Sequence, residues 1–480
     1  MEPLENLRKI RLEKLAKIQK LKINPYPAKT DKKQTIKECL SLQNKEVTTA
    51  GRIMAIRVHG GSTFADLVDQ SSKIQLFFSK DKLSTVNHEL LTLLDIGDFI
   101  QVQGKIGKTQ AGEITIFVNN FTLLTKSLRP IPTSFYGLKD IETRLRKRHL
   151  DLITNPEVFD LFVAKTKFWT AIRQFLINSD FMEVETPALE HVPGGADATP
   201  FVTHHKALDT DFYLRISLEL YQKRLIIGGF EKIFEIGKVF RNEGIDSEHL
   251  QDYLQMEFYW AYANYHDLMN FIPKMYKFVV QETLGKTKSK FDSGEIDWSK
   301  PWPKIDYCDS FRQETRIDLA KEPSLEELFK LAAKVGLQPD KKLGKGRLID
   351  LIYKKTIRSK IIRPSLLINH PVSVSPLAKR LEDDPQKVQR IQVLAVGTEV
   401  GNGWSELNNP IDQEERFREQ QTLRKAGDEE AQMYDKDFIE ALEYGMPPTA
   451  GFGLSQRLFA VLVDKPIRET VFFPTLRPGK

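Results

Sequence analysis

The spacing of hydrophobic residues changes several times along the chain, and each change predicts a different element. Over residues 4–22, leucine and isoleucine recur every three or four positions, which is typical of an amphipathic helix. Most other positions there are lysine or arginine, so the remaining faces would be solvated or lie along nucleic-acid phosphates. We therefore predict a basic helix and a connector over residues 1–45.

Residues 46–125 follow a different pattern. Apolar and polar residues alternate in five short runs, which polar or glycine-containing turns separate. This pattern predicts a small Greek-key barrel of the OB type, a fold that binds single-stranded nucleic acid by stacking bases on aromatic side chains. Phe64 lies on one of these strands and either fills the core or faces a ligand; the pattern alone favours the core.

The rest of the chain mixes helices and strands, so we predict the α+β class. Residues 126–154 are predicted to be a linker, and the basic run at its end, including Arg146 and Arg148, would contact nucleic acid or solvent. Residues 155–480 are predicted to form one domain. It opens with a long amphipathic helix over residues 155–179, and residues 311–375 are expected to be largely helical.

Residues 232–263 are predicted to form the centre of this domain. Their pattern predicts an apolar strand, a polar loop and a second apolar strand. Because alternate residues of a strand share a face, Arg241 points the same way as Glu243, and Glu257 the same way as Tyr259. An antiparallel pairing would place all four on one surface. A guanidinium, two carboxylates and a phenol suit a ligand that carries both phosphate and ammonium groups.

A second polar strand is predicted at residues 399–408, with Asn402, Trp404 and Glu406 on one face. Glu399 has the opposite parity unless one of the neighbouring glycines allows a bulge. Two carboxylates near phosphate oxygens would suit Mg²⁺, which takes few protein ligands. The alternative is a solvated acidic strand.

Two upstream positions are further candidates. Gly195 follows another glycine, and the pair could let a ligand approach the backbone closely. Glu219 is predicted at the start of a helix, where it either binds a ligand or is a surface glutamate stabilised by the helix dipole.

Composition restricts the number of domains and the kinds of partner that the chain can have. The 480 residues, 41% of them hydrophobic, suffice for two or three domains. A net charge of +6 permits a polyanionic partner. Cys39 and Cys308 are too far apart in sequence to suggest a disulfide framework or a structural zinc. No apolar run reaches the roughly 18 residues of a membrane span, and the first residues are charged, so we expect a cytoplasmic protein with no membrane partner.

The sequence FRNE at residues 240–243, followed by MEFYWAYA at 256–263, resembles the second signature motif of class II aminoacyl-tRNA synthetases, in the lysyl-tRNA synthetase form. Residues 155–187 resemble the first motif, and GFGLSQR at 451–457 resembles the third. The resemblance covers nearly the whole chain. It implies that an OB-type anticodon-binding barrel precedes a class II antiparallel-sheet catalytic domain with a helical insertion at about 311–375.

The function implied by this resemblance is that of a lysine–tRNA ligase. Such an enzyme activates lysine with ATP to lysyl-adenylate and transfers the lysyl group to the 3′ end of tRNA(Lys). The resemblance also implies Mg²⁺, up to three ions with ATP, and a homodimer.

The resemblance assigns a role to each matching position. The catalytic residues implied are Arg241 and Arg457. The ATP contacts implied are Arg241, Glu243, His249, Tyr253, Glu399 and Arg457. The lysine contacts implied are Gly195, Glu219, Glu257, Tyr259, Asn402, Trp404 and Glu406. The metal ligands implied are Glu399 and Glu406, and the anticodon contacts are Arg57, Phe64 and Gln75.

The chain departs from the family pattern at three places. Glu248 stands where many bacterial relatives carry a basic residue, and Trp404 replaces the usual phenylalanine. The third motif reads GFGLSQR where the family usually reads GIGIDR, with Gln456 in place of the acid. The change at Glu248 and the altered third motif favour one alternative, an inactive relative that binds RNA through the barrel.

Two enzyme alternatives also share parts of the pattern. An aspartyl- or asparaginyl-type synthetase has the same barrel and core, but its pocket would need a cation or amide donors rather than Glu219 and Glu406. A lysyl-transferase that acts on a protein acceptor would generally lack the barrel.

Overall fold

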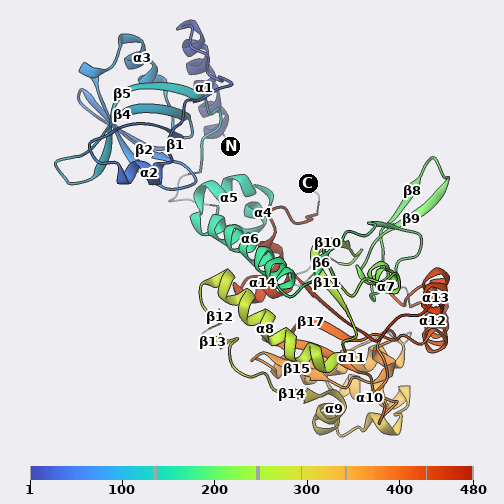
Figure 1. Cartoon of the computed structure of the whole chain (residues 1–480). Helices are drawn as coiled ribbons and strands as arrows, with labels where there is room; N and C mark the ends of the chain where they lie inside the picture. Colours follow the sequence, from blue (N-terminus) through green and yellow to red (C-terminus); the bar gives the residue numbers. More distant parts are fainter. Residues whose placement is uncertain are drawn as a thin grey trace. The chain divides into compact units, whose positions relative to one another are not determined.

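The computed structural model describes residues 2–132, 138–244, 249–292, 294–340, 343–428 and 430–477. The chain divides into two compact units, Met1–Asp140 and Ile141–Lys480 (Figure 1).

The smaller unit is built around a closed barrel of five strands in the order β1-β2-β3-β5-β4, so the predicted OB-type barrel is confirmed. Its strands are β1 (Glu46–His59), β2 (Ser62–Val68), β3 (Lys73–Ser79), β4 (Phe99–Lys108) and β5 (Ile114–Thr125). Its helices are α1 (Glu2–Lys20), α2 (Ile36–Ser41) and α3 (Thr85–Leu93).

Alternation along the strands decides which side chains fill the barrel. On β2, Ala65 and Leu67 are buried in the core, whereas Phe64 has the opposite parity and is only half-buried. The core position that the pattern favoured for Phe64 is therefore wrong, because the alternation places it on the outer face.

The larger unit contains an eight-stranded sheet in the order β14-β15-β16-β17-β18-β11-β10-β6. All neighbouring pairs are antiparallel except β14 with β15 and β10 with β6. These strands are β6 (Met182–Glu183), β10 (Lys232–Phe240), β11 (Asp252–Ala261), β14 (Lys304–Asp306), β15 (Ser365–Ile368), β16 (Arg390–Ala395), β17 (Thr398–Ser405) and β18 (Thr449–Ser455). The predicted α+β class is confirmed.

Helices cover this sheet, and smaller elements flank it. α6 (Pro156–Ile177) packs against α8 (Tyr265–Leu284), and both helices bury side chains in one core with β11, β17 and β18. Four further helices of this unit are α7 (Glu219–Ile227), α12 (Pro410–Lys425), α13 (Lys436–Glu443) and α14 (Arg457–Leu462). Two small sheets consist of β7 (Leu189–Glu190), β8 (Val202–His205) and β9 (Thr210–Leu214), and of β12 (Lys288–Phe291) and β13 (Gly294–Asp297).

The predicted helical insertion has different limits in the structure. Its helices are α9 (Tyr307–Thr315), α10 (Leu325–Lys334) and α11 (Lys345–Thr356), which share a core of their own. β15, however, lies within the predicted range 311–375 and pairs with β14 and β16 in the main sheet. A buried apolar run of four residues has no periodicity that distinguishes a strand from a helix.

The predicted linker also contains regular structure, α4 (Ile141–Arg146) and α5 (Arg148–Thr154). Arg148 is buried, donates to Asp151 at 2.6 Å and to the Phe472 carbonyl at 3.0 Å, and so joins the start of the unit to its C-terminal segment. The prediction that Arg148 contacts nucleic acid or solvent is wrong, because its charge is satisfied inside the unit.

None of the helices in the described ranges combines the length and apolar content that crossing a bilayer requires.

The change Arg148→Met should lower the free energy of unfolding of the larger unit by about 2 kcal/mol, because Asp151 keeps only Arg144 as an ion-pair partner and the carbonyls of Val471 and Phe472 lose a donor. Arg146→Met is the matched control. The Arg146 side chain is 35% exposed and pairs with a half-exposed Glu142, so its loss should cost less than about 1 kcal/mol. All five tryptophans lie in the larger unit, so urea unfolding followed by tryptophan fluorescence measures it. Equal losses in the two variants would contradict a structural role for Arg148.

Candidate active site

A cavity of about 1280 Å³ opens in the larger unit. Strands β11, β17 and β18 form its floor, and residues of α11, residues 373–378, the end of α12, Glu430 and Gln432 contribute to its walls. The cavity gathers every residue predicted for ATP, lysine or metal binding, namely Gly195, Glu219, Arg241, Glu243, His249, Tyr253, Glu257, Tyr259, Glu399, Asn402, Trp404, Glu406 and Arg457. Their individual roles stay predictions. Glu248 lies outside the described residues.

Two rows of cross-strand neighbours make the floor of the cavity. Gly451 on β18 lies between Tyr259 on β11 and Trp404 on β17. Gly453, two residues on, lies between Glu257 and Asn402 on the same two strands. Because these positions share one face of the sheet, the glycines of the middle strand leave a trough between larger side chains.

Two glycines, which have no side chain, also keep the inner end of this trough open. A Cβ atom at Gly451 would collide with Oε1 of Glu406 and with the Tyr259 ring. Gly195 has a φ of +82°, and a Cβ atom there would collide with the Ser217 hydroxyl. Glycine is therefore required at both positions for the walls to approach this closely.

One end of the cavity carries a fixed cation. Arg241 follows β10 directly; its Nε donates to the Ile216 carbonyl at 3.2 Å, and its guanidinium lies 5.6 Å from the centre of the Tyr253 ring. Burial acts to lower the pKa of Arg241, but Tyr253 and nearby carboxylates outweigh it and raise the pKa overall. The guanidinium is thus held in place and charged, as an anion-binding group must be.

Two further groups lie at this cationic end. Nε2 of His249 is 4.0 Å from Oε2 of Glu243. Arg457 is the first residue of α14, which follows β18 after a short turn. Because β18 pairs along its length with β11 and in part with β17, the position of Arg457 is fixed by the sheet.

Glu257 lies between the two ends of the cavity. Its Oε1 accepts hydrogen bonds from the Leu218 backbone at 3.1 Å and from the Gln255 amide, and its Oε2 accepts from the Tyr259 hydroxyl at 3.0 Å. Burial and the charge of Glu219 raise the pKa of Glu257 to about 7, although the hydrogen bonds act to lower it.

The other end of the cavity is acidic, and a buried lysine that the sequence reasoning missed lies behind it. The ammonium of Lys223 contacts Oε1 of Glu219 and Oε2 of Glu406. The indole N–H of Trp404 donates to the same Oε2 of Glu406 at 2.8 Å. Burial raises the pKa of both Glu219 and Glu406 to about 7 against the lowering by Lys223. Oε1 of Glu406 is buried and has no hydrogen-bond partner among the described residues.

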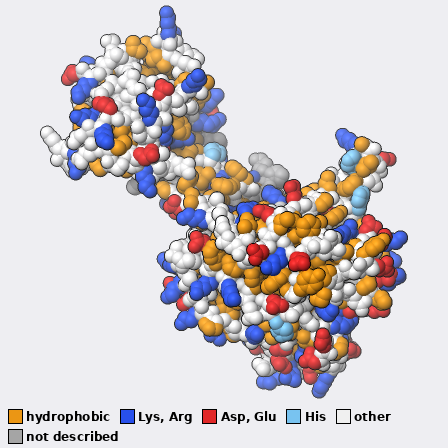
Figure 2. All heavy atoms as spheres, in the orientation of Figure 1, with side chains coloured by type: hydrophobic (Ala, Val, Ile, Leu, Met, Phe, Trp, Pro, Cys, Tyr) orange, Lys and Arg blue, Asp and Glu red, His pale blue; other side chains and the backbone are white. Residues whose placement is uncertain are grey.

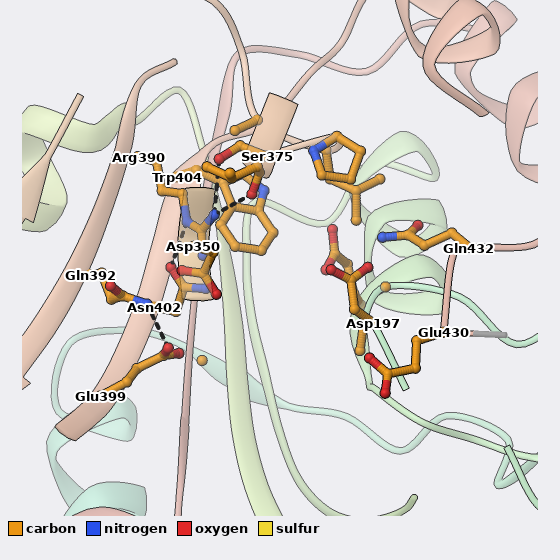
Figure 3. A pocket seen from close by; sticks show the side chains of 18 of the residues that line it. Asp197, Asp350, Ser375, Arg390, Gln392, Glu399, Asn402, Trp404, Glu430 and Gln432 are labelled. Atoms are coloured by element: carbon orange, nitrogen blue, oxygen red, sulfur yellow. Dashed lines mark hydrogen bonds between the residues drawn. The ribbon is translucent and has the colours of Figure 1, made fainter. Parts of the chain in front are cut away.

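Glu399 reaches the cavity because β17 is irregular. Gly401 pairs with Val393 and Glu399 pairs with Leu394, so one residue is extra on β17 between these two pairs. The Gln392 amide donates to Oε2 of Glu399 at 2.5 Å, as Figure 3 shows.

Arg390, also missed from the sequence, supports the adjacent strand. Its Nε donates to Oδ1 of Asn402 at 3.0 Å, and Nη1 donates to the Ser375 hydroxyl at 2.9 Å (Figure 3). Its guanidinium lies 5.7 Å from the centre of the Trp404 ring. The strand pattern gives parity but no partner for such a residue, so no sequence signal pointed to Arg390 or Gln392.

In the smaller unit, the predicted anticodon residues share one outer face of the barrel. Arg57 is the cross-strand neighbour of Phe64, and Asp66, two residues on, is the neighbour of Gln75. Arg57 donates to Asp66 at 2.6 Å. The Phe64 ring lies 5.0 Å from the Phe77 ring, so two aromatic faces are adjacent beside a guanidinium and an amide.

Comparison with known proteins identifies the class. Residues 140–477 match the family model of the class II tRNA synthetases (D, K and N), and residues 47–124 match that of the OB-fold nucleic acid binding domain. The chain therefore belongs to the class II tRNA synthetases.

The relatives narrow the family further. A lysine–tRNA ligase of Moorella thermoacetica is 43% identical over 484 residues, which cover 100% of this chain and 99% of the relative. The lysine–tRNA ligase of Thermoanaerobacter pseudethanolicus is 44% identical, over 99% of this chain and 97% of the relative. That of Halalkalibacterium halodurans is 41% identical, again over 99% and 97%. The predicted resemblance to lysyl-tRNA synthetases is confirmed.

Proposed function

We propose that the protein is a lysine–tRNA ligase, which activates lysine with ATP and transfers the lysyl group to the 3′ end of tRNA(Lys). The observation that carries the choice of amino acid is Oε1 of Glu406 at the acidic end of the cavity, which no group in the described part of the chain hydrogen-bonds. A buried acceptor that carries negative charge suits the ammonium of a lysine side chain. It would repel the carboxylate of aspartate and leave the amide of asparagine without a matching charge.

The two ends of the cavity suit the two substrates of the first step. Arg241 and Arg457 provide positive charge for the ATP phosphates, and His249, Glu243 and Tyr253 flank them. The lysine carboxylate would attack the α-phosphorus of ATP, and pyrophosphate would leave. This step needs in-line positioning and charge neutralisation at the phosphate rather than a protein nucleophile.

Class II synthetases generally use Mg²⁺ with ATP, and the donor set at Glu399 fits such an ion. The Glu399 carboxylate is one protein ligand, but Mg²⁺ takes few protein ligands when phosphates supply the rest. When bound, Mg²⁺ neutralises phosphate charge. We assign Glu399 to this function and Glu406 to the lysine ammonium, because Lys223 already places a positive charge against Glu406. The prediction of up to three ions is kept.

The deciding experiment is ATP–pyrophosphate exchange with lysine, aspartate, asparagine and arginine in separate reactions. We expect exchange with lysine alone, and its loss on addition of EDTA. Exchange with aspartate or asparagine instead would place the protein with the related synthetases. A folded protein that exchanges with none of them would be an RNA-binding relative.

We propose that the barrel face around Phe64 reads the anticodon of tRNA(Lys). Phe64→Ala should raise the KM for tRNA in aminoacylation at least about fivefold, because stacking of a base on an aromatic ring is worth about 1–3 kcal/mol. ATP–pyrophosphate exchange needs no tRNA and should not change. Val58→Ala is the control, since Val58 is exposed on β1 with the opposite parity to Arg57. An unchanged KM in the Phe64 variant would refute this function of the face.

We propose that the protein is a homodimer in the cytoplasm. Figure 2 shows hydrophobic side chains on the surface of the larger unit. Among the exposed ones are Val163 and Ile177 on α6 and Met182 on β6, the edge strand of the sheet. Light scattering should give twice the chain mass of 55.2 kDa, and Ile177→Glu with Met182→Lys should give the monomer. A monomeric wild-type protein would refute the dimer.

Cell fractionation tests the proposed location in the cytoplasm.

A further inference from the structure

Lys223 lies behind the acidic end of the cavity. It is on α7, one turn after Glu219, and its ammonium also contacts Glu406, which follows β17. Its side chain is only 1% exposed, and the Phe438 ring lies 5.8 Å from Nζ. Glu219 and Glu406 line the cavity, so Lys223 contacts the two carboxylates from the side of the protein interior.

The charges of Glu219, Lys223 and Glu406 do not cancel. When both glutamates are ionised, two carboxylates and one ammonium sum to one net negative charge in a buried site. An incoming ammonium would bring the sum to zero, whereas a neutral side chain would leave one charge without a counter-charge. Because uncompensated buried charge is costly, this sum is itself a criterion for the ligand.

The contacts also fix which oxygen of Glu406 is left for a ligand. Lys223 and the Trp404 indole both bind Oε2. Oε1 then lies next to Tyr259 and to Gly451, where a Cβ atom would collide with it. Gly451 and Tyr259 both line the cavity, so the unpartnered oxygen is on the side where a ligand would lie.

We propose that Lys223 is a positioning residue for substrate selection. It neutralises Glu219 and holds Glu406 so that one oxygen and one net negative charge remain for the side-chain ammonium of the substrate lysine. This inference rests on the proposed function and deepens it. Lys223 acts through Glu406 and does not touch the substrate.

Loss of Lys223 has a different consequence from loss of Glu219. Without Lys223, two buried carboxylates repel each other, and Glu406 loses the donor that orients it. Without Glu219, Lys223 and Glu406 neutralise each other, and no charge is left for the substrate. Without both charges, Glu406 alone restores one net negative charge.

The experiment is therefore a double-mutant cycle with Lys223→Met, Glu219→Gln and the pair combined, measured by lysine-dependent ATP–pyrophosphate exchange. We expect each single change to raise the KM for lysine at least about tenfold, which is about 1.4 kcal/mol, with the KM for ATP within about twofold of wild type. The combined variant should have a lower KM for lysine than either single variant.

Lys330→Met is the matched control. Lys330 also pairs with a glutamate four residues earlier, Glu326, but on the surface of α10 and 73% exposed. The KM for lysine should not change in this variant. L-Norleucine has a lysine-like side chain without the side-chain ammonium, so it should inhibit the wild-type protein poorly. The ratio of the KM for lysine to the inhibition constant of L-norleucine should rise in Lys223→Met.

Each outcome decides the proposal. The proposal is overturned by an unchanged KM for lysine in Lys223→Met, or by equal rises in the KM for lysine and the KM for ATP. It is also overturned if the KM for lysine of the combined variant is not below that of each single variant. If Lys223→Met does not fold, a folded combined variant with a lower KM for lysine than Glu219→Gln supports it, and an unfolded one overturns it. Wild-type protein without lysine-dependent exchange would instead refute the proposed function.

Discussion

The balance of buried charge at the acidic end of the cavity is the constraint on which the site depends. Glu219, Lys223 and Glu406 are all buried, and uncompensated charge there would cost several kcal/mol. The surrounding residues meet this demand in different ways. Trp404 adds an N–H donor to Glu406, and Gly451 leaves room for the other oxygen of the same carboxylate. The shape of the pocket and its charge are therefore set by the same contacts.

The sheet register brings these groups together from distant parts of the chain. β18 lies between β11 and β17, so the glycines of the third motif separate the tyrosine and glutamate of the second motif from the residues of β17. A shift of one residue would turn every side chain to the opposite face. The altered third motif does not disturb this register. Gln456 is buried in the turn after β18, where its Oε1 accepts from Lys165, and α14 begins at the next residue.

The sequence was sufficient where a motif or a strict alternation carried the information. The five barrel strands and the gathering of the motif residues in one cavity follow from such patterns. Lys223 could not be predicted, because a glutamate and a lysine four residues apart on a helix usually form a solvated pair. Only the approach of Glu406 after β17 makes this pair part of a site. Arg148 and β15 were misjudged for the same reason, since local sequence does not show what a distant segment covers.

The hydrogen bonds of Glu257 explain how one cavity can serve both phosphate and ammonium. An ionised carboxylate has about four acceptor positions. Donors from Leu218, Gln255 and Tyr259 already occupy three of these positions, and two of the donors bind Oε1. One position remains, on Oε2, which suits a single N–H donor such as the α-ammonium of an amino acid. Glu257 lies on the same strand as Tyr253, which contacts Arg241, and as Tyr259, which lies next to Glu406. An amino acid held there would have its carboxylate toward the arginines and its side chain toward the acidic end.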